Sequence, residues 1–323
     1  MPQPEPPGSV SVVERTVERT LTIALPDAEI ARRLSPPPDG SRIIVWDLGD
    51  PAPDVPIDLL VLRYMIPPAE LRGLDAVSVS VVQSQTLGFD GVRETLPAGI
   101  VYCNAVDVHE ASTGELTLAL ILASQRGIGE AVTAQSRGEW AHAQHPGLAG
   151  KTVLLIGVGG VGREIERRLT PFDARIVRVA RSARTDARGE VHGMESLAAL
   201  VPEADIVVLA VPLAGDTRHL VDAEFLGLLR PGALVVNVAR GGVVDTAALV
   251  DWLAAGRGRA ALDVTDPEPL PAHHPLWALA GVIVTPHLGG HTDAMAGRID
   301  RVVLEQVRRL QAGEPPLNPV LGG

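Results

Sequence analysis

The sequence predicts an α/β protein with two doubly wound parallel sheets and a cleft between them. First, two series of short apolar runs alternate with helix-length segments along the chain. Second, a glycine-rich turn follows the first apolar run of the second series and leads into a helix-like segment. Third, the chain has 323 residues, which is more than a single hydrophobic core usually serves. Two domains of ordinary size are therefore expected.

The first series begins after a Pro-rich segment, residues 1–18, which has no periodicity and is predicted to be a disordered tail. Apolar runs at residues 21–25, 43–46, 59–62, 77–82 and 100–102 are predicted strands, and residues 28–34 and 68–74 resemble helices. Residues 115–126 are apolar on nearly every face, so they are predicted to form a buried helix that links the two domains.

The second series predicts a six-stranded sheet. Its strands are expected at residues 153–156, 176–180, 206–211, 233–238, 260–264 and 282–285. An amphipathic helix is expected at residues 299–310, followed by a Pro-rich extended tail. The predicted domains are residues 19–106 with 292–323, and residues 107–291.

The glycine turn has the spacing Gly157-x-Gly159-x-x-Gly162. Gly157 permits a tight turn, Gly159 lets the backbone approach a pyrophosphate, and Gly162 lets the following helix pack against the strand. Gly160 and Val161 complete the motif. A plain glycine turn is the alternative, but the strand before it and the helix after it favour a dinucleotide site, and hence Rossmann-like domains.

The end of the next strand carries Arg181, Ser182 and Arg184 and has no acidic residue. A carboxylate at this position would bind the ribose diol of NAD, whereas arginine and serine can bind the 2′-phosphate of NADP. The sequence therefore favours NADP, with NAD possible. The alternative is that both arginines are solvated loop cations.

Composition narrows the range of functions. The formal net charge of −11 gives no general attraction to nucleic acid or anionic lipid, and no apolar run is long enough to span a membrane. Cys103 is the only cysteine, which suits the cytoplasm and a packing role, and no spacing indicates a metal site.

Three polar residues of the second series follow predicted strands. Arg240 comes after the fourth strand, Glu268 after the fifth and His287 after the sixth. Because ligands bind beyond the carboxyl ends of parallel strands, these side chains are expected to share one crevice. Together they suit hydride transfer to a 2-keto acid: the arginine binds the carboxylate and polarises the carbonyl, the histidine donates a proton, and the glutamate holds the imidazolium. Individually each residue also has a structural interpretation, and His291 is predicted to be structural.

Five motifs in order resemble the D-isomer-specific 2-hydroxyacid dehydrogenases, including glyoxylate and hydroxypyruvate reductases. They are the glycine turn, residues 211–217 (VPLAGDT), residues 238–242 (VARGG), Asp263 through Glu268, and residues 285–287 (TPH). The resemblance implies that Arg240, Glu268 and His287 are catalytic and that Asp263 meets the nicotinamide carboxamide. It also implies that the cofactor runs along Val211, Pro212, Thr217, Val238, Ala239 and Gly289.

By the same resemblance, the first domain binds substrate. The backbone of Leu87 and Gly88 is expected to hold the substrate carboxylate, with Tyr64 and Met65 lining the pocket, although Gln85 and Thr86 depart from the family's Gly-rich pattern. Trp140 matches a segment that packs across a homodimer.

The expected function is NADP-dependent reduction of a small 2-keto acid, such as glyoxylate or hydroxypyruvate, to a D-2-hydroxy acid. Two alternatives remain: an NAD-preferring dehydrogenase, and a corepressor-type protein that uses the same fold to sense cofactor and bind partners.

Overall fold

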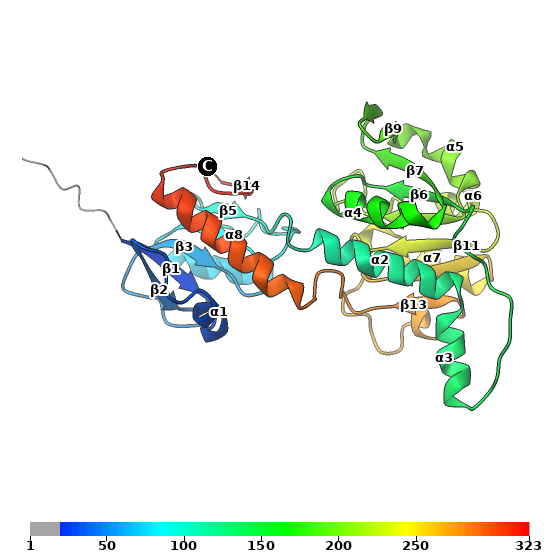
Figure 1. The fold of residues 1–323 in the computed structure, drawn as a ribbon, viewed down its shortest axis with the longest axis horizontal. Coiled ribbons are helices and arrows are strands. Elements are labelled where there is room, and N and C mark those ends of the chain that lie inside the picture. The colour runs from blue at the N-terminus through cyan, green and yellow to red at the C-terminus, as the bar shows by residue number, and fades with distance from the viewer. Residues whose placement is uncertain (1–19, 323) are drawn as a thin grey trace, which may run out of the picture.

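The computed structural model describes residues 20–322, so the tail predicted at residues 1–18 lies outside the described residues. The chain forms two lobes, each built on a sheet with helices on its faces (Figure 1). The predicted α/β class with two Rossmann-like units is confirmed.

The first lobe contains a six-stranded sheet of order β14-β5-β4-β3-β1-β2. Its strands are β1 (Leu21–Leu25), β2 (Ser41–Val45), β3 (Ile57–Val61), β4 (Val79–Gln83), β5 (Val101–Cys103) and β14 (Pro319–Leu321). The five N-terminal strands pair in parallel, close to the predicted ranges. β14 pairs antiparallel with β5, so part of the predicted extended tail is an edge strand, a position that tolerates Pro319.

Helices cover both faces of this sheet. Alternate strand residues Leu59, Val61 and Val81 pack with Ile299 and Val303 of helix α8 (Ala294–Gln311). The intervening residues of the same strands face a second cluster, which includes Leu71 of the 3-10 helix η1 (Pro68–Ala76). Helix α8 thus belongs to the core of the first lobe, although the five parallel strands of this lobe lie much earlier in the sequence.

The second lobe contains an eight-stranded sheet of order β13-β12-β11-β10-β6-β7-β9-β8. Six of its strands correspond to the predicted ones: β6 (Thr152–Ile156), β7 (Arg175–Ala180), β10 (Ile206–Leu209), β11 (Ala233–Asn237), β12 (Gly258–Leu262) and β13 (Val282–Val284). Each face of this sheet carries its own apolar cluster. One cluster contains Leu154, Val207 and Val235, and the other contains Leu155, Val208 and Val236.

The prediction of six strands missed an antiparallel hairpin, β8 (Arg184–Asp186) and β9 (Gly189–Gly193), at the sheet edge. Its residues are mostly polar and exposed, so they lack the apolar alternation that reveals a strand. Arg178 of the adjacent β7 donates to Asp186 of β8 at 2.9 Å, and Val191 of β9 is fully buried. The hairpin is therefore held to the sheet by a polar contact and by one apolar side chain.

The remaining helices complete the two lobes. They are α1 (Ala28–Arg33), α2 (Glu110–Gln125), α3 (Ile128–Ser136), α4 (Gly160–Leu169), α5 (Leu197–Leu200), α6 (Ala223–Leu228) and α7 (Thr246–Ala254), with short 3-10 turns η2 (Thr170–Phe172), η3 (Met194–Ser196), η4 (Val201–Glu203), η5 (Gly241–Val243) and η6 (Pro275–Trp277). The linking helix α2 starts five residues earlier than predicted, because the buried Glu110 accepts bonds from the amides of Asp107 and His109 at its start.

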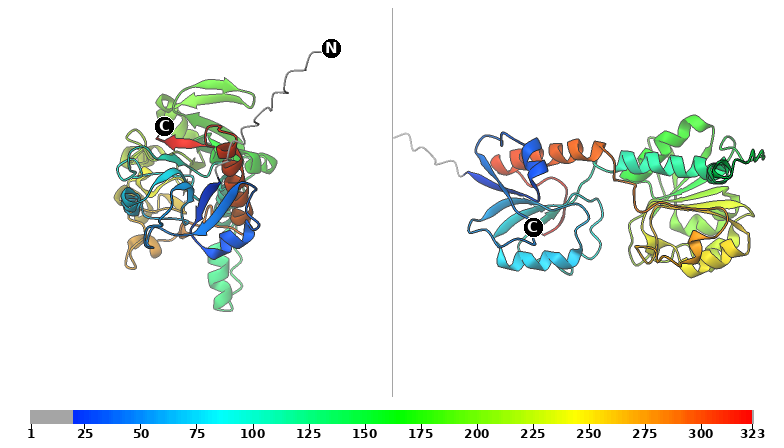
Figure 2. Two further views of the ribbon diagram at one scale, coloured as in Figure 1. Left: turned by 90° about the vertical axis from the view of Figure 1, so that its left-hand side faces the viewer. Right: turned by 90° about the horizontal axis from the view of Figure 1, so that it is seen from below.

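The chain crosses between the lobes twice, before α2 and again before α8 (Figure 2). The two crossings meet at the buried ring of His109, whose Nδ1 lies 3.2 Å from the carbonyl of Gly290 and whose Nε2 lies 2.6 Å from the carbonyl of Gln85. Among residues 20–322, no helix combines the length and apolarity needed to cross a membrane.

Candidate active site

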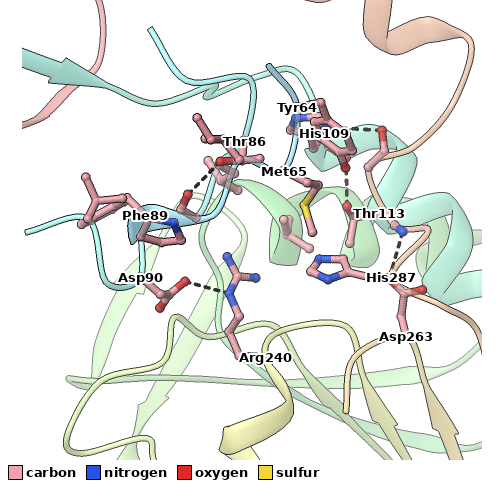
Figure 3. A pocket seen from close by; sticks show the side chains of 18 of the residues that line it. Tyr64, Met65, Thr86, Phe89, Asp90, His109, Thr113, Arg240, Asp263 and His287 are labelled. Carbon is pink, nitrogen blue, oxygen red and sulfur yellow. Dashed lines mark hydrogen bonds and ion pairs between the residues drawn. The ribbon is translucent and has the colours of Figure 1, made fainter. Parts of the chain in front are cut away.

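A cavity of about 330 Å³ lies between the lobes, where residues from both sheets meet (Figure 3). It brings together all six predicted substrate residues: Tyr64, Met65, Leu87, Gly88, Arg240 and His287. Four predicted cofactor residues also line it: Val161, Val238, Asp263 and Gly289. Residues predicted to bind substrate and residues predicted to bind cofactor therefore line one cavity, although they are far apart in sequence.

His287 and Glu268 form a close pair at one side of this cavity. The imidazole Nδ1 lies 2.6 Å from Glu268 Oε1, and the side chains are 27 % and 37 % exposed. Burial raises the pKa of Glu268, but the hydrogen bond and charge of His287 outweigh it and hold this pKa below its ordinary value. The carboxylate thus stays ionised at neutral pH and can accept a hydrogen bond from the imidazole Nδ1–H.

Asp263 holds the backbone that carries His287. Its buried carboxylate accepts from Thr285 Oγ1 at 2.6 Å and from the amides of Leu288 and Gly289 at 2.8 and 2.9 Å. His287 itself donates its amide to the Asp263 carbonyl at 2.8 Å and has a left-handed φ of 53°. This supporting role of Asp263 was not foreseen from the sequence.

Arg240 lies opposite His287 and is held from two directions. Its NH1 donates to the carbonyl of Ala239 at 2.6 Å, and its Nε donates to Asp90 of the first lobe at 2.8 Å. Behind it, the buried Asn237 donates to the Arg240 carbonyl at 2.9 Å and accepts from the Ala239 amide at 3.0 Å. The Arg240–Asp90 ion pair joins the two lobes across the cavity.

Sequence reasoning did not assign a role to Asp90. Its only signal was its place two residues after Gly88, within the segment already matched to a substrate loop. Gly88 lies directly under Arg240, because a Cβ on this glycine would come within 1.6 Å of the guanidinium NH2. The third nitrogen of Arg240 is thus directed at the substrate loop.

The loop of Leu87 and Gly88 has its carbonyls occupied and its amides available. Asn104 donates to the Leu87 carbonyl at 2.8 Å, and Thr86 donates to the Gly88 carbonyl at 2.9 Å. Within residues 20–322, neither the Leu87 nor the Gly88 amide donates to another group. Gln85 and Thr86, which depart from the family pattern, therefore shape a loop that still presents two N–H donors next to Arg240.

The glycine turn fits a dinucleotide pyrophosphate. Gly157 has a φ of 105°, and a Cβ there would lie 2.2 Å from the Ala210 carbonyl, whereas a Cβ on Gly162 would lie 2.0 Å from the Gly157 carbonyl. A Cβ on Gly159 would meet nothing within 4 Å, so space is open in front of the first amides of α4. Gly160 is required for packing between helices, since a Cβ at this position would come within 2.8 Å of Glu110 in α2.

The residues predicted to read the adenosine ribose lie at the end of β7. Arg181 is 75 % exposed and pairs through Nε with Asp216 at 3.3 Å. Arg184 begins β8 and donates to the Ser182 carbonyl at 3.3 Å. In the neighbouring turn, Thr217 Oγ1 bonds Pro212 and Ala214 backbone atoms, so its hydroxyl shapes residues 211–217.

A second cavity of about 470 Å³ adjoins the first and shares Tyr64, Met65, Asp263 and His287 with it. His291, predicted to be structural, also lines this cavity, with its ring centroid 5.5 Å from that of Tyr64. Burial and the charge of Asp263 raise the pKa of Tyr64, so its phenol remains protonated at neutral pH. Among residues 20–322, no cluster of His, Cys, Asp and Glu is suited to a metal ion.

Comparison with known proteins agrees with this arrangement. Residues 118–289 match the family described as D-isomer specific 2-hydroxyacid dehydrogenase, NAD binding domain. The chain is 34 % identical over 255 residues to the glyoxylate reductase of Thermococcus gammatolerans, covering 75 % of this chain and 76 % of that protein. It is also 34 % identical over 258 residues to the D-3-phosphoglycerate dehydrogenase of Methanocaldococcus jannaschii, covering 76 % of this chain but only 48 % of the longer relative.

Solved structures extend the likeness to both lobes. A D-isomer specific 2-hydroxyacid dehydrogenase from Xanthobacter autotrophicus, in complex with NADPH and MES, superposes with a TM-score of 0.78 at 28 % identity, covering 94 % of this chain and 98 % of that one. The NADPH-dependent glyoxylate/hydroxypyruvate reductase of Sinorhizobium meliloti gives 0.79 at 26 % identity, covering 93 % and 97 %. The chain therefore belongs to the D-isomer specific 2-hydroxyacid dehydrogenase family of NAD(P)-dependent oxidoreductases.

Proposed function

We propose that the protein reduces a small 2-keto acid to the D-2-hydroxy acid, with NADP(H) preferred over NAD(H). The observation that carries this proposal is the cavity lined by Arg240, His287, Leu87 and Gly88, with Glu268 bonded to His287 from outside it. A bound nicotinamide cofactor supplies the hydride. The remaining steps belong to side chains and backbone groups of this chain.

The substrate carboxylate binds the free amides of Leu87 and Gly88, and the guanidinium of Arg240 neutralises its charge. Arg240 also donates to the keto oxygen, which polarises the carbonyl. Asp90 and the Ala239 carbonyl hold two guanidinium nitrogens, so the third keeps its direction toward the loop.

His287 donates its proton to the keto oxygen as negative charge develops there. Its Nδ1 is bonded to Glu268, so the proton that moves is the one on Nε2. Glu268 stabilises the imidazolium before transfer, and Asp263 keeps the loop of His287 in place. In the oxidative direction the same histidine accepts the proton.

The cofactor is held by the glycine turn of Gly157, Gly159, Gly160, Val161 and Gly162, with Val211, Pro212, Thr217, Val238, Ala239, Asp263 and Gly289 along its length. The NADP preference is supported by Arg181, Ser182 and Arg184. Arg181 Nε lies 3.3 Å from Asp216 Oδ2, and because both groups are largely exposed this pair is weak and can give way to a 2′-phosphate.

His287→Ala tests the proposed chemistry. We expect kcat for reduction to fall by about 10²–10⁴-fold, while the Kd for NADPH stays within about twofold of the parent value. A matched control is His274→Ala, a loop histidine that lines neither cavity. Turnover by His287→Ala that equals the parent at neutral pH would contradict the assignment.

Arg181→Ala tests the cofactor preference separately. The ratio of kcat/KM for NADPH over NADH should fall about 10-fold or more, since a charge-assisted bond contributes about 1.5–3 kcal/mol. The control is Arg257→Ala, an exposed arginine on the far end of the sheet. A parent protein that favours NADH would refute the NADP preference but leave the reaction itself standing.

We also propose that the protein is a cytoplasmic homodimer. The segment after α3 carries Trp140, which is 95 % exposed, and α3 itself exposes Ile128 (50 %) and Val132 (59 %). Such a group of exposed apolar side chains is typical of a protein interface. Sedimentation of the parent and of Trp140→Ala tests the dimer, and a monomeric parent would refute it.

A further inference from the structure

The second cavity next to the candidate active site is lined mainly by apolar side chains. Its apolar wall comprises Met65, Pro269, Leu270, Trp277, Val284, Pro286 and Leu288. Several of these side chains are unusually open to solvent for their size: Met65 is 49 % exposed, Trp277 52 % and Leu288 40 %. An apolar surface of this kind, left uncovered inside a cleft, is typical of a ligand site.

This cavity opens from the proposed reaction site. Both cavities are lined by Tyr64, Met65 and His287, so a substituent on the keto carbon can extend from one to the other past the Met65 side chain. Figure 3 shows Met65 directed toward His287. Met65 has a left-handed φ of 57°, a costly conformation for a residue with a side chain, and such strain is concentrated at ligand-binding positions.

The charges around the second cavity exclude an anionic substituent. The ionisable side chains that line it are Tyr64, Asp263, Glu268, His287 and His291, and no lysine or arginine of the described chain is among them. The His287 imidazole is already paired with Glu268 at 2.6 Å, so a second carboxylate or a phosphate would meet the carboxylates of Asp263 and Glu268 without a cation of its own. Burial of an uncompensated anion costs far more than burial of a hydrocarbon gains.

We propose that the preferred substrates are 2-keto acids with a branched or aromatic hydrocarbon substituent that occupies the second cavity. This inference rests on the proposed reductase function and names its substrate class. Glyoxylate and hydroxypyruvate leave the apolar wall uncovered, and keto acids with a phosphate or second carboxylate are rejected. Met65, an unbranched and adaptable side chain, accommodates substituents of different shape.

The first test is a series of keto acids with NADPH at saturation. From pyruvate through 2-oxobutanoate to 4-methyl-2-oxopentanoate, kcat/KM should rise about fourfold for each buried methylene. Phenylpyruvate should also exceed glyoxylate, and oxaloacetate and phosphohydroxypyruvate should be the poorest. Equal values along the series, or a maximum at glyoxylate, would overturn the inference.

Two variants locate the effect. Trp277→Ala should lower kcat/KM for 4-methyl-2-oxopentanoate about 10-fold while changing the value for glyoxylate less than about threefold, and Trp277→Phe should show the same preference with a smaller loss. Leu304→Ala, a control on α8 with a similar exposure of 44 %, should change neither. If both variants reduced the two substrates by the same factor, the apolar wall would not determine specificity.

A binding measurement separates this inference from the proposed reaction. Oxamate mimics a keto acid without turnover, and N-isobutyloxamate adds the branched substituent. In the presence of NADPH, calorimetry should show N-isobutyloxamate binding about 10-fold or more tightly than oxamate, with the advantage lost in Trp277→Ala. If no keto acid were reduced, the reductase proposal would fail. The ratio of the two binding constants would still show whether the second cavity binds an apolar substituent.

Discussion

The bond between Glu268 and His287 gives a prediction that can be worked out from the structure. Replacing Glu268 by Gln keeps the size of the side chain and removes its charge. Because the pKa of Glu268 lies below its ordinary value, the parent carboxylate remains ionised over the whole neutral range. The charge-assisted bond to His287 is therefore present throughout this range, whereas the Gln variant keeps only a neutral hydrogen bond.

The size of the effect follows from the geometry. A charge-assisted bond of this length, 2.6 Å, contributes about 1.5–3 kcal/mol. The partial exposure of the two side chains, 27 % and 37 %, places the pair at the low end of that range because solvent screens it. Since about 1.4 kcal/mol corresponds to a factor of ten in rate, kcat/KM of Glu268→Gln at neutral pH should lie roughly tenfold below the parent value.

The assay is kcat/KM for the best keto acid between pH 5 and 10, measured with saturating NADPH. Glu190→Gln is the matched control, because Glu190 also pairs with a histidine, His192 at 3.6 Å, on the exposed hairpin of the second lobe. That variant should keep the parent profile. Parent efficiency in Glu268→Gln, or an equal loss in Glu190→Gln, would refute the coupling.

Three further substitutions test separate parts of the site. Arg240→Lys should lower kcat/KM at least 100-fold, because the planar fork is lost although the charge remains, and wild-type efficiency would make Arg240 structural. Asp90→Asn should lower kcat/KM about 10-fold with an unaltered Kd for NADPH, since the ion pair at 2.8 Å orients Arg240 from the opposite lobe; a loss confined to NADPH binding would contradict this. Gly162→Ala should reduce the free energy of unfolding in urea by about 1–3 kcal/mol, because its Cβ would meet the Gly157 carbonyl at 2.0 Å. Gly159→Ala should leave the free energy of unfolding unchanged and weaken NADPH binding, because a Cβ there meets no protein atom within 4 Å. The reverse pattern would show that the turn does not face the cofactor.

The sequence was informative where one physical signal dominates. Buried parallel strands are continuous apolar runs, so the five parallel strands of the first lobe and six of the second were predicted within a few residues. The hairpin of β8 and β9 was missed because its residues are mostly polar, and β14 was missed because its three residues, which follow a Pro-rich segment, are too few to show a periodic pattern.

The candidate site was likewise predictable only in part. The proximity of Arg240, Glu268 and His287 could be foreseen because the carboxyl ends of parallel strands lie at one edge of the sheet. Asp90 could not, since its significance depends on an arginine 150 residues away in the other lobe. The apolar cavity was equally hidden, because Met65, Trp277 and Leu288 come from three separate loops whose meeting is a property of the tertiary fold alone.

The meeting of the two chain crossings at His109 has a mechanical consequence. Any rotation of one lobe against the other must pivot near these segments, and groups close to a pivot travel least. His287, the proposed proton donor, lies only three residues before Gly290, whose carbonyl contacts the His109 ring, so it is close to the expected pivot. Arg240 and Asp90 belong to neither crossing and come from opposite lobes. The distance between the Arg240 guanidinium and the Asp90 carboxylate, 2.8 Å here, should therefore increase as the lobes move apart.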